Sequence, residues 1–259
     1  LTNLSNYVGD VANITPLNSR PFVGRSAFAH KGGVHVSAIL KNPLAYEHIA
    51  PELVGNKQRV LVSDLAGKSN IEYKARELGI DLGQHNGVSR RIVDEIKRLE
   101  DEGYQFDAAE GSLSLLIKKI TGEFVEPFTL ECFHVIASKT AHHPSLAQAT
   151  IKISVGGEEE LTAAEGNGPI NALDNALRKA LTKFYPQLGR MHLTDFKVRI
   201  VEGSEGTAAK VNATIESQDE DDTWTTIGVS ENVIEASWLA LVDSLQYKLS
   251  KDRVNRNSR

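Results

Sequence analysis

"GNGPINALDNALRKAL" (residues 166–181) and "GVSENVIEASWLALVDSL" (residues 228–245) decide the fold of the second half of this chain. Each begins at a Gly-containing turn and continues with hydrophobic residues at the three- and four-residue spacing of a helix. The second stretch repeats the first about 63 positions later. A repetition at this distance predicts an internally duplicated structural unit.

Three strand-like runs precede each of these predicted helices. They are "FTLECFHVIAS", "ATIKISV" and "EELTAAEG" before the first, and "HLTDFKVRIVE", "TAAKVNATIES" and "TWTTIGVS" before the second. We therefore predict two copies of a βββα unit. Because one copy cannot bury its sheet face alone, the copies are expected to pack about a pseudo-twofold axis, and such symmetric pairing also favours a homodimer.

Residues 1–120 have a different, mostly helical pattern. "NIEYKARELGI", "GVSRRIVDEIKRLEDEGYQF" and "DAAEGSLSLLIKKI" predict helices, and "RVLVSDL" predicts a short extended segment. The expected fold is thus α+β, with helical linker subdomains in residues 1–120 and the duplicated domain in residues 121–259. Trp224 and Trp238 are expected in the core, with Trp238 on the inward face of its helix, and Cys132 is expected to be buried in a strand.

Composition and charge exclude several classes of function. The formal net charge of -5 lies in the second half, and no Lys/Arg stripe marks a surface for nucleic acid or an anionic membrane. No apolar run approaches the ~20 residues that cross a bilayer. The single cysteine cannot form an internal disulfide and fits a reducing compartment. The chain begins "LTNLSNYVGD", without Met or a secretory signal, so we expect a cytoplasmic protein fragment.

Two long stretches carry a family resemblance. "YVGDVANITPLNSRPFVGRSAFAHKGGVHVSAILKNPLAYEHIAPELVG" resembles the segment that follows the catalytic barrel in the 2-isopropylmalate and citramalate synthase family, and residues 121–259 resemble its C-terminal amino-acid-sensing domain. "HKGGVHVSAI" and "SDLAGKSNI" are more similar to citramalate synthases. The resemblance implies an enzyme that condenses acetyl-CoA with a 2-oxo acid, pyruvate in a citramalate synthase, under feedback by a branched-chain amino acid.

The catalytic barrel itself is absent from this sequence. The family's barrel binds a divalent metal through an H-x-H pattern, which does not occur here, and residues 1–120 lack the alternating strands and helices of a barrel. The adjacent His142 and His143 lie in a Pro-containing stretch without a third ligand, which is more typical of a solvated turn than of a metal site. We therefore expect no cofactor in this part, and no catalysis by it alone.

His35 and Tyr46 are the candidate catalytic residues that the resemblance implies. They match the family's G-x-H histidine and Y-E tyrosine, which reach into the barrel of the partner subunit. Histidine suits proton transfer near neutral pH, and a phenol can donate to a developing oxyanion. Asn42, between them, is a further candidate for the same contact. From composition alone, His30, His35 and His48 are more typical of surface or capping histidines than of catalytic ones.

"GNGP" (residues 166–169) allows three interpretations. It is a strand-to-helix turn with Pro169 in the first helical turn, an anion-binding turn, or, by resemblance, a loop that binds the polar groups of a feedback amino acid. Asp195 is either a receiver of the ammonium group or an ordinary surface residue, and Ala208 and Ala209 leave room for a branched side chain. The complete set of candidate effector-binding residues is Gly166, Gly168, Pro169, Ile170, Asn171, Leu193, Asp195, Phe196, Ile200, Ala208 and Ala209.

Two alternatives stay open at this point. The first is the corresponding part of a 2-isopropylmalate synthase, with 2-oxoisovalerate as substrate and leucine as effector instead of pyruvate and isoleucine. A methyl group's position in a hydrophobic pocket changes binding by only ~1–3 kcal/mol, so the sequence does not separate the two effectors. The second is a free-standing amino-acid-binding module, which would have no use for His35 and Tyr46.

Overall fold

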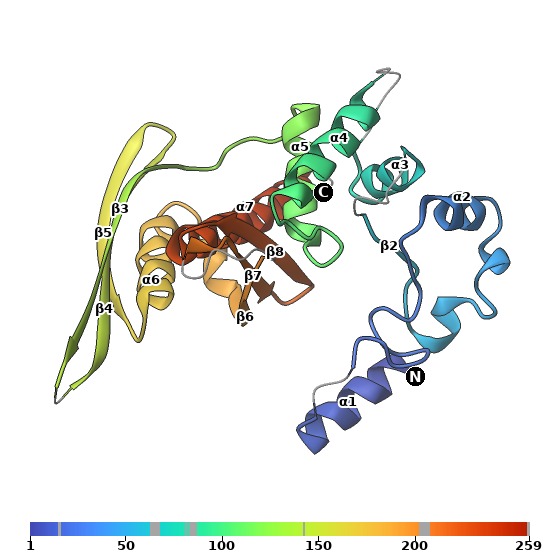
Figure 1. Ribbon diagram of the computed structural model, residues 1–259, viewed down its shortest axis with the longest axis horizontal. Helices are drawn as coiled ribbons and strands as arrows, with labels where there is room; N and C mark the ends of the chain where they lie inside the picture. The colour runs from blue at the N-terminus through green and yellow to red at the C-terminus, as the bar shows by residue number, and fades with distance from the viewer. Residues whose placement is uncertain are drawn as a thin grey trace. The chain divides into compact units, whose positions relative to one another are not determined.

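The structure divides into one unit of short helices, residues 1–100, and a second unit, residues 101–259, that contains both three-stranded sheets (Figure 1). This computed structural model describes residues 1–14, 17–62, 68–80, 82, 87–141, 143–201 and 208–257. His142 and the first five residues of "SDLAGKSNI" therefore lie outside the described residues.

The first unit is organised around a pair of short parallel strands, β1 (Ala29–His30) and β2 (Arg59–Val60). Val36 and Ile39 of α2 (Gly33–Lys41) pack with Val60, and Tyr73 of the next helix closes this cluster. The helical spacing of Val36 and Ile39 thus directs one face of α2 toward β2. The other elements are α1 (Thr2–Ala12), η1 (Pro43–Ala45), η2 (Pro51–Val54), α3 (Lys68–Glu77) and α4 (Val88–Asp101).

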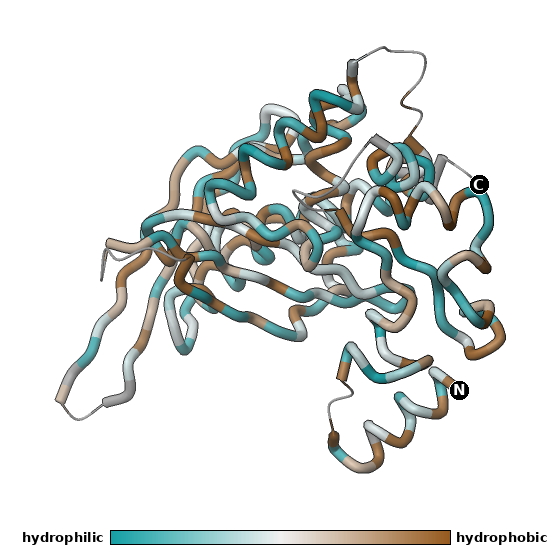
Figure 2. The backbone as a smooth tube through the Cα atoms, turned by 45° about the vertical axis from the view of Figure 1, so that its right-hand side comes forward, coloured by the Kyte–Doolittle hydropathy of each residue, from teal (hydrophilic) through white to brown (hydrophobic). Residues whose placement is uncertain are grey.

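Helix α1 presents hydrophobic side chains to the surface of its unit. Leu4, Val8 and Val11 recur at helical spacing and are exposed. Figure 2 shows the hydrophobic residues along this helix, beside the N-terminus. The helical spacing of these residues is that of an amphipathic helix, but their apolar side chains are not buried against the rest of the first unit.

The second unit contains two βββα repeats, which confirms the predicted fold class. In each repeat the three strands are antiparallel and lie in sequence order, β3-β4-β5 and β6-β7-β8. The first repeat consists of β3 (Thr129–Thr140), β4 (His143–Val155), β5 (Glu158–Gly166) and α6 (Pro169–Thr182). After η3 (Pro186–Arg190), the second consists of β6 (His192–Ile200), β7 (Val211–Gln218), β8 (Thr223–Ser230) and α7 (Val233–Asn257).

The two repeats share irregular details as well as their order of elements. The first strand of each is shifted in register near its start, between Leu130 and Cys132 in β3 and between Leu193 and Asp195 in β6. A threonine of the third strand also bonds to the helix in both repeats. Its hydroxyl donates to a backbone carbonyl oxygen, from Thr162 to Ala176 over 2.9 Å and from Thr226 to Ala240 over 2.7 Å. These matched features align the repeats residue by residue.

The helices α6 and α7 lie between the two sheets and form the core (Figure 1). Helix α6 covers β4 and β5, α7 covers β7 and β8, and the two helices contact each other. The strand and helix backbones approach closely at two glycines. A Cβ atom at Gly166 would lie 2.4 Å from the amide nitrogen of Ala172, and one at Gly228 would lie 2.1 Å from the carbonyl oxygen of Ala236. Only glycine permits this packing at either position.

Helix α5 (Glu110–Thr121) belongs to the second unit, packed on α7 and β8. The Ser112 hydroxyl donates to a carboxylate oxygen of Asp243 over 2.7 Å and accepts from the amide of Ile227 over 3.0 Å. Burial raises the pKa of Asp243, against the opposing influence of Lys119 and Ser112. From the change in hydrophobic period we predict the domain boundary near residue 120. The second compact unit begins at residue 101 and therefore also includes α5.

The expected burial of the tryptophans is confirmed, and that of the cysteine is wrong. Trp224 and Trp238 lie in the core. Cys132 is exposed, because β3 alternates: Phe133 and Val135 pack against the core, and Cys132 therefore points to the other face of the sheet.

Candidate functional site

An exposed aromatic pair brings two of the predicted catalytic residues together in the first unit. His35 lies on α2 and Tyr46 directly follows η1, and their ring centroids are 4.4 Å apart at an interplanar angle of 33°. Both side chains are exposed, Tyr46 by 49%. The arrangement offers an imidazole that can transfer a proton beside a phenol that can donate a hydrogen bond.

Asn42 sets the geometry of this pair through the backbone. It ends α2, where its amide donates to the carbonyl oxygen of Ala38, and it begins η1, where its side-chain oxygen accepts from the amide of Leu44 over 3.2 Å. This capping places Tyr46 one short turn after α2, within contact of His35. The structure thus shows a structural task for Asn42, and its predicted catalytic role stays a prediction.

The Gly32-Gly33 pair lies at the start of α2. Gly32 is the N-cap with φ -71° and ψ 133°, and the helix begins at Gly33. A Cβ atom at Gly32 would meet the His35 ring at 3.9 Å, an ordinary contact. Neither residue therefore weakens a helix interior, and the described part of this unit leaves room for a side chain at Gly32.

A buried carboxylate holds the segment behind Tyr46. Glu47 is 4% exposed, and one of its oxygens is 2.9 Å from Nε2 of His30 and 2.9 Å from Nε2 of Gln58. These contacts join β1, the segment after η1 and the segment before β2. His30, for which no role was predicted, thus contacts the buried Glu47 and helps to hold the backbone next to Tyr46.

A pocket of about 520 Å³ in the second unit gathers four of the predicted effector residues. It lies between α6, η3 and the start of β6, so residues from both repeats line it. The predicted residues in its wall are Ile170, Asn171, Leu193 and Phe196, and the additional ones are Asp174, Arg178, Thr182, Leu188, Gly189, Met191 and His192.

An ion pair in this pocket was missed by sequence reasoning. Nε of Arg178 donates to a carboxylate oxygen of Asp174 over 2.7 Å, and Nη1 of Arg178 donates to the carbonyl oxygen of Met191 over 3.0 Å. Both side chains are largely shielded from solvent, at 21% and 16% exposure. The i, i+4 spacing of Asp and Arg on a predicted helix was the available signal, although it is common on solvated helix faces as well.

The "GNGP" turn lies directly before two residues of the pocket wall, Ile170 and Asn171. Gly168 is the extended N-cap of α6 and Pro169 is its first residue, while the side-chain oxygen of Asn171 accepts from the amide of Asn167 over 3.1 Å. Gly166 is required by the close approach of β5 to α6. The turn is therefore a strand-to-helix connection whose last contacts, through Ile170 and Asn171, reach the pocket wall.

The remaining predicted effector residues lie elsewhere on the second repeat. The carboxylate of Asp195 pairs with Lys197, Ile200 is 67% exposed, Ala208 is exposed and Ala209 is buried. The structure does not bring these four residues into the wall of the pocket, and a role for them in effector binding stays a prediction.

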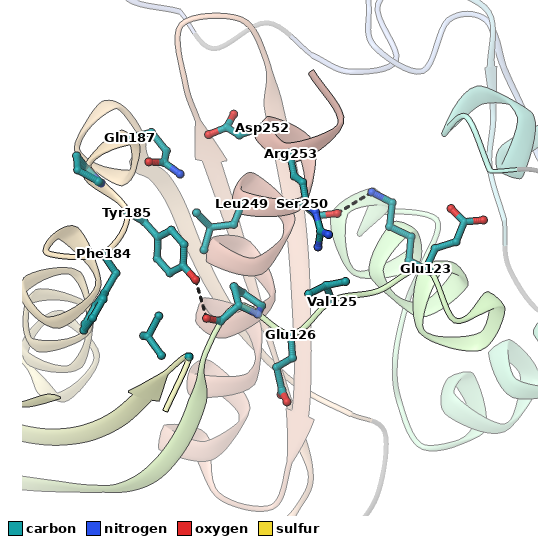
Figure 3. Close-up of a pocket in the computed structure, with 15 residues that line it drawn as sticks. Glu123, Val125, Glu126, Phe184, Tyr185, Gln187, Leu249, Ser250, Asp252 and Arg253 are labelled. Carbon is teal, nitrogen blue, oxygen red and sulfur yellow. Dashed lines mark hydrogen bonds between the residues drawn. The ribbon is translucent and has the colours of Figure 1, made fainter. Parts of the chain in front are cut away.

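A second cavity, of about 870 Å³, lies beside the segment that joins α5 to β3 (Figure 3). The Tyr185 hydroxyl donates to the carbonyl oxygen of Pro127 over 2.7 Å, and Nζ of Lys118 donates to the Ser250 hydroxyl over 2.7 Å. Burial lowers the pKa of Lys118, against the opposing influence of Glu123, and burial raises the pKa of Tyr185. The first bond attaches the connecting segment to the turn between α6 and η3, and the second attaches α5 to α7.

Neither a membrane span nor a metal centre is found among the residues that the structure describes. Within them, no helix has the length and apolar character that crossing a membrane requires. Nor do three or more His, Cys, Asp or Glu side chains of this part of the chain gather where they would hold a metal ion.

Comparison with known proteins agrees with this architecture. The (R)-citramalate synthase of Aquifex aeolicus is 53% identical over 253 residues, covering 97% of this chain and 48% of the relative. That of Geobacter sulfurreducens is 52% identical over 252 residues, with 97% and 48% covered. The 2-isopropylmalate synthase of Methanocaldococcus jannaschii is 27% identical over 253 residues, with 97% and 47% covered. The chain thus spans about half the length of these relatives.

Two family matches follow the division of the structure. Residues 22–104 match the homocitrate synthase post-HMGL domain-like family. Residues 107–249, which comprise α5, all six strands of the two repeats and most of α7, match the LeuA allosteric (dimerisation) domain. Since this second match covers more than half of the sequence, the chain belongs to the family of the LeuA allosteric (dimerisation) domain.

Proposed function

We propose that this chain is the regulatory and dimerisation region of an (R)-citramalate synthase, and that its pocket between α6 and β6 binds isoleucine as a feedback effector. The observation that carries this proposal is the pocket itself, because it unites four residues predicted from the resemblance with a shielded ion pair. The family match over both repeats supports an allosteric role, and a homodimer is proposed on the same ground.

The lining of the pocket fits a branched-chain amino acid. Ile170, Leu188, Leu193 and Phe196 offer apolar surface for an aliphatic side chain. A zwitterion also needs one partner of each charge, and the pocket holds an aspartate beside an arginine. We propose that Asp174 receives the ammonium group. Arg178 has guanidinium donors beyond those that bond to Asp174 and Met191, and we propose that it receives the carboxylate.

The similarity to named relatives favours pyruvate over 2-oxoisovalerate as the substrate of the whole enzyme. Two (R)-citramalate synthases are more than 50% identical to this chain, whereas the 2-isopropylmalate synthase reaches 27%. Isoleucine is proposed as effector for the same reason, and leucine is the alternative.

For the first unit we propose a contribution to catalysis in the partner subunit. Condensing acetyl-CoA with a 2-oxo acid needs a proton removed from the acetyl methyl group and charge stabilised on the oxo oxygen. His35 suits the proton transfer, and the Tyr46 phenol suits donation to the oxyanion. The divalent metal that the resemblance implies belongs to the barrel, and no residue of this chain is assigned to it. A free-standing sensor would leave this exposed pair without a task.

Titration calorimetry on the chain with isoleucine, leucine and valine tests the effector proposal. Isoleucine is expected to bind most tightly, within the ~1–3 kcal/mol that separates such isomers in an apolar pocket. The Phe196→Ala variant should bind more weakly, since it loses apolar contact. No heat with any of the three amino acids, from a sample whose circular dichroism shows a folded protein, would contradict the proposal.

A matched pair of variants identifies the carboxylate that receives the ammonium group. Asp174→Asn removes a charge inside the pocket, whereas Asp195→Asn removes one that is paired with Lys197 outside the pocket wall. Weaker binding by the first variant alone supports the assignment to Asp174. Weaker binding by the second alone restores the sequence-based expectation for Asp195.

A further inference from the structure

We propose that the effector pocket has a pseudo-twofold counterpart within the same chain, and that Trp238 closes this counterpart, so that each chain holds one open site. This inference rests on the proposed function, because it concerns the same pocket. It assigns a new role to two positions: Asp174 leaves the space open in one half, and Trp238 fills it in the other.

Asp174 and Trp238 occupy equivalent positions in the two repeats. The threonine hydrogen bonds from β5 to α6 and from β8 to α7 identify Ala176 with Ala240. Asp174 and Trp238 each lie two residues before these alanines. The equivalence therefore rests on hydrogen bonds and does not depend on sequence similarity at the two positions.

Phe133 and Phe196 are equivalent in the same way. Phe133 pairs with Ile151 just after the register shift of β3, and Phe196 pairs with Ile215 just after the register shift of β6. Each is the first aromatic residue beyond the shift on the first strand of its repeat.

These four residues meet across the repeats in two related places. Phe133, in the first repeat, packs against Trp238, in the second, with ring centroids 5.2 Å apart. In the exchanged arrangement, Phe196 of the second repeat and Asp174 of the first line the same 520 Å³ pocket. A strand of one repeat thus faces the helix of the other in both places. One place contains an indole and the other contains open space.

The neighbours of these residues show the same contrast in charge. Four residues before Asp174 and Trp238, both helices carry an isoleucine, Ile170 in α6 and Ile234 in α7. Four residues later, Arg178 in α6 corresponds to Val242 in α7, a partly buried residue packed on the core. At the positions of Asp174 and Arg178, the open half therefore holds both charges that a zwitterion needs. At the same two positions the closed half holds the uncharged Trp238 and Val242, and Trp238 is 4% exposed. A carboxylate nearby, that of Glu235, replaces Asn171 of the pocket wall, but no arginine lies four residues after Trp238.

Filling the open half in the same manner is the decisive experiment. Asp174→Trp places an indole where Trp238 stands in the other half, and it should abolish the isoleucine heat while the protein stays folded. The matched control Asp174→Asn keeps the space and loses only the charge, so its binding should weaken about tenfold, as expected for a hydrogen bond to a charged group. The introduced indole should be buried, with blue-shifted emission.

The converse variant opens the closed half. Trp238→Asp combined with Val242→Arg reproduces the charged pair and should raise the isoleucine stoichiometry from one to two per chain. Because this variant removes a core side chain and can fail to fold, Asp174→Trp decides the matter by itself.

The outcomes separate this inference from the proposed function. Wild-type chain that binds no amino acid contradicts the proposed function, and the emission of Asp174→Trp then still reports whether the space accepts an indole. Two isoleucine molecules per wild-type chain overturn the inference. So does undiminished binding by Asp174→Trp, or red-shifted emission from an indole that remains in water.

Discussion

Two aromatic pairs, one in each unit, have similar contact geometry and opposite surroundings. The ring centroids of His35 and Tyr46 are 4.4 Å apart on the surface of the first unit, and those of Phe133 and Trp238 are 5.2 Å apart in the second, and both pairs are tilted. Trp238 is surrounded by the core, whereas Tyr46 is 49% exposed. The difference teaches that a ring contact by itself assigns no role, because burial decides whether the contact stabilises the fold or leaves its polar groups available for chemistry.

Removing the buried ring should have the largest effect on stability. Trp238→Ala leaves a cavity between β3 and α7, and we expect a loss of about 3–5 kcal/mol in the free energy of unfolding. Urea unfolding measures it. The control is His35→Ala, for which the expected change is within about 0.5 kcal/mol, as for most surface substitutions. Equal losses for the two variants would break the comparison.

Removing the exposed rings should act on turnover instead. In the full-length enzyme, His35→Ala is expected to lower turnover by about 10²-fold or more, as for a lost proton-transfer group. Isoleucine binding, measured by calorimetry, should be unchanged. Tyr46→Phe keeps the ring contact and removes only the hydroxyl, so a loss of turnover in this variant separates the phenol's chemistry from its packing. Normal turnover in both variants contradicts the catalytic assignment.

Charged side chains as well as apolar packing stabilise the second unit, and the buried Asp219 is the clearest case. Burial alone raises the pKa of Asp219, but hydrogen bonds from Lys248, from two backbone amides of the following turn and from Lys251 outweigh it and hold the pKa well below its usual range. The folded state therefore binds this proton less readily than the unfolded state. The stabilisation is complete above the ordinary aspartate pKa of about 4 and is lost as the pH falls through the lower folded-state value.

The test is Asp219→Asn against wild type over a range of pH. We expect the free energy of unfolding of the variant to be about 2 kcal/mol lower at neutral pH, in the range for hydrogen bonds to a charged group. The difference between the two proteins should shrink as the pH falls below about 4, where the aspartate of the unfolded chain takes up its proton before that of the folded protein does. A difference that stays constant down to acidic pH would show that the ionised form of Asp219 contributes nothing.

The smallest expected effect concerns the geometry of the exposed pair. Asn42→Ala removes the cap between α2 and η1 and should lower the free energy of unfolding by about 1 kcal/mol. Asn42→Ser retains a capping oxygen and should lower it by less. If Asn42 only positions Tyr46, Asn42→Ser keeps most of the turnover in the full-length enzyme. A large loss of turnover in Asn42→Ser would support the catalytic role expected from the sequence.

The sequence predicted the duplicated fold because the repeats differ little in hydrophobic period. It did not predict that α5 joins the second unit, since the buried hydroxyl contacts of Ser112 are made with residues more than a hundred positions away. Cys132 was misplaced because its apolar neighbours on β3 concealed the alternation. Within the pocket, Leu193 and Phe196 were found by motif. Asp174 and Arg178 were not predicted, because an Asp–Arg pair on a helix is typical of a solvent-exposed face. Only the position of β6 opposite α6 shows that the pair lines a pocket.

The close approach of β8 to α7 has an evolutionary consequence. A Cβ atom at Gly228 would lie 2.1 Å from a backbone oxygen, and backbone cannot move aside without displacing the whole helix. Members of this family whose pockets bind different ligands are therefore expected to keep glycine at this place, while the side chains around the pocket diverge. The backbone contact would then be conserved, whereas the lining residues could change with the ligand.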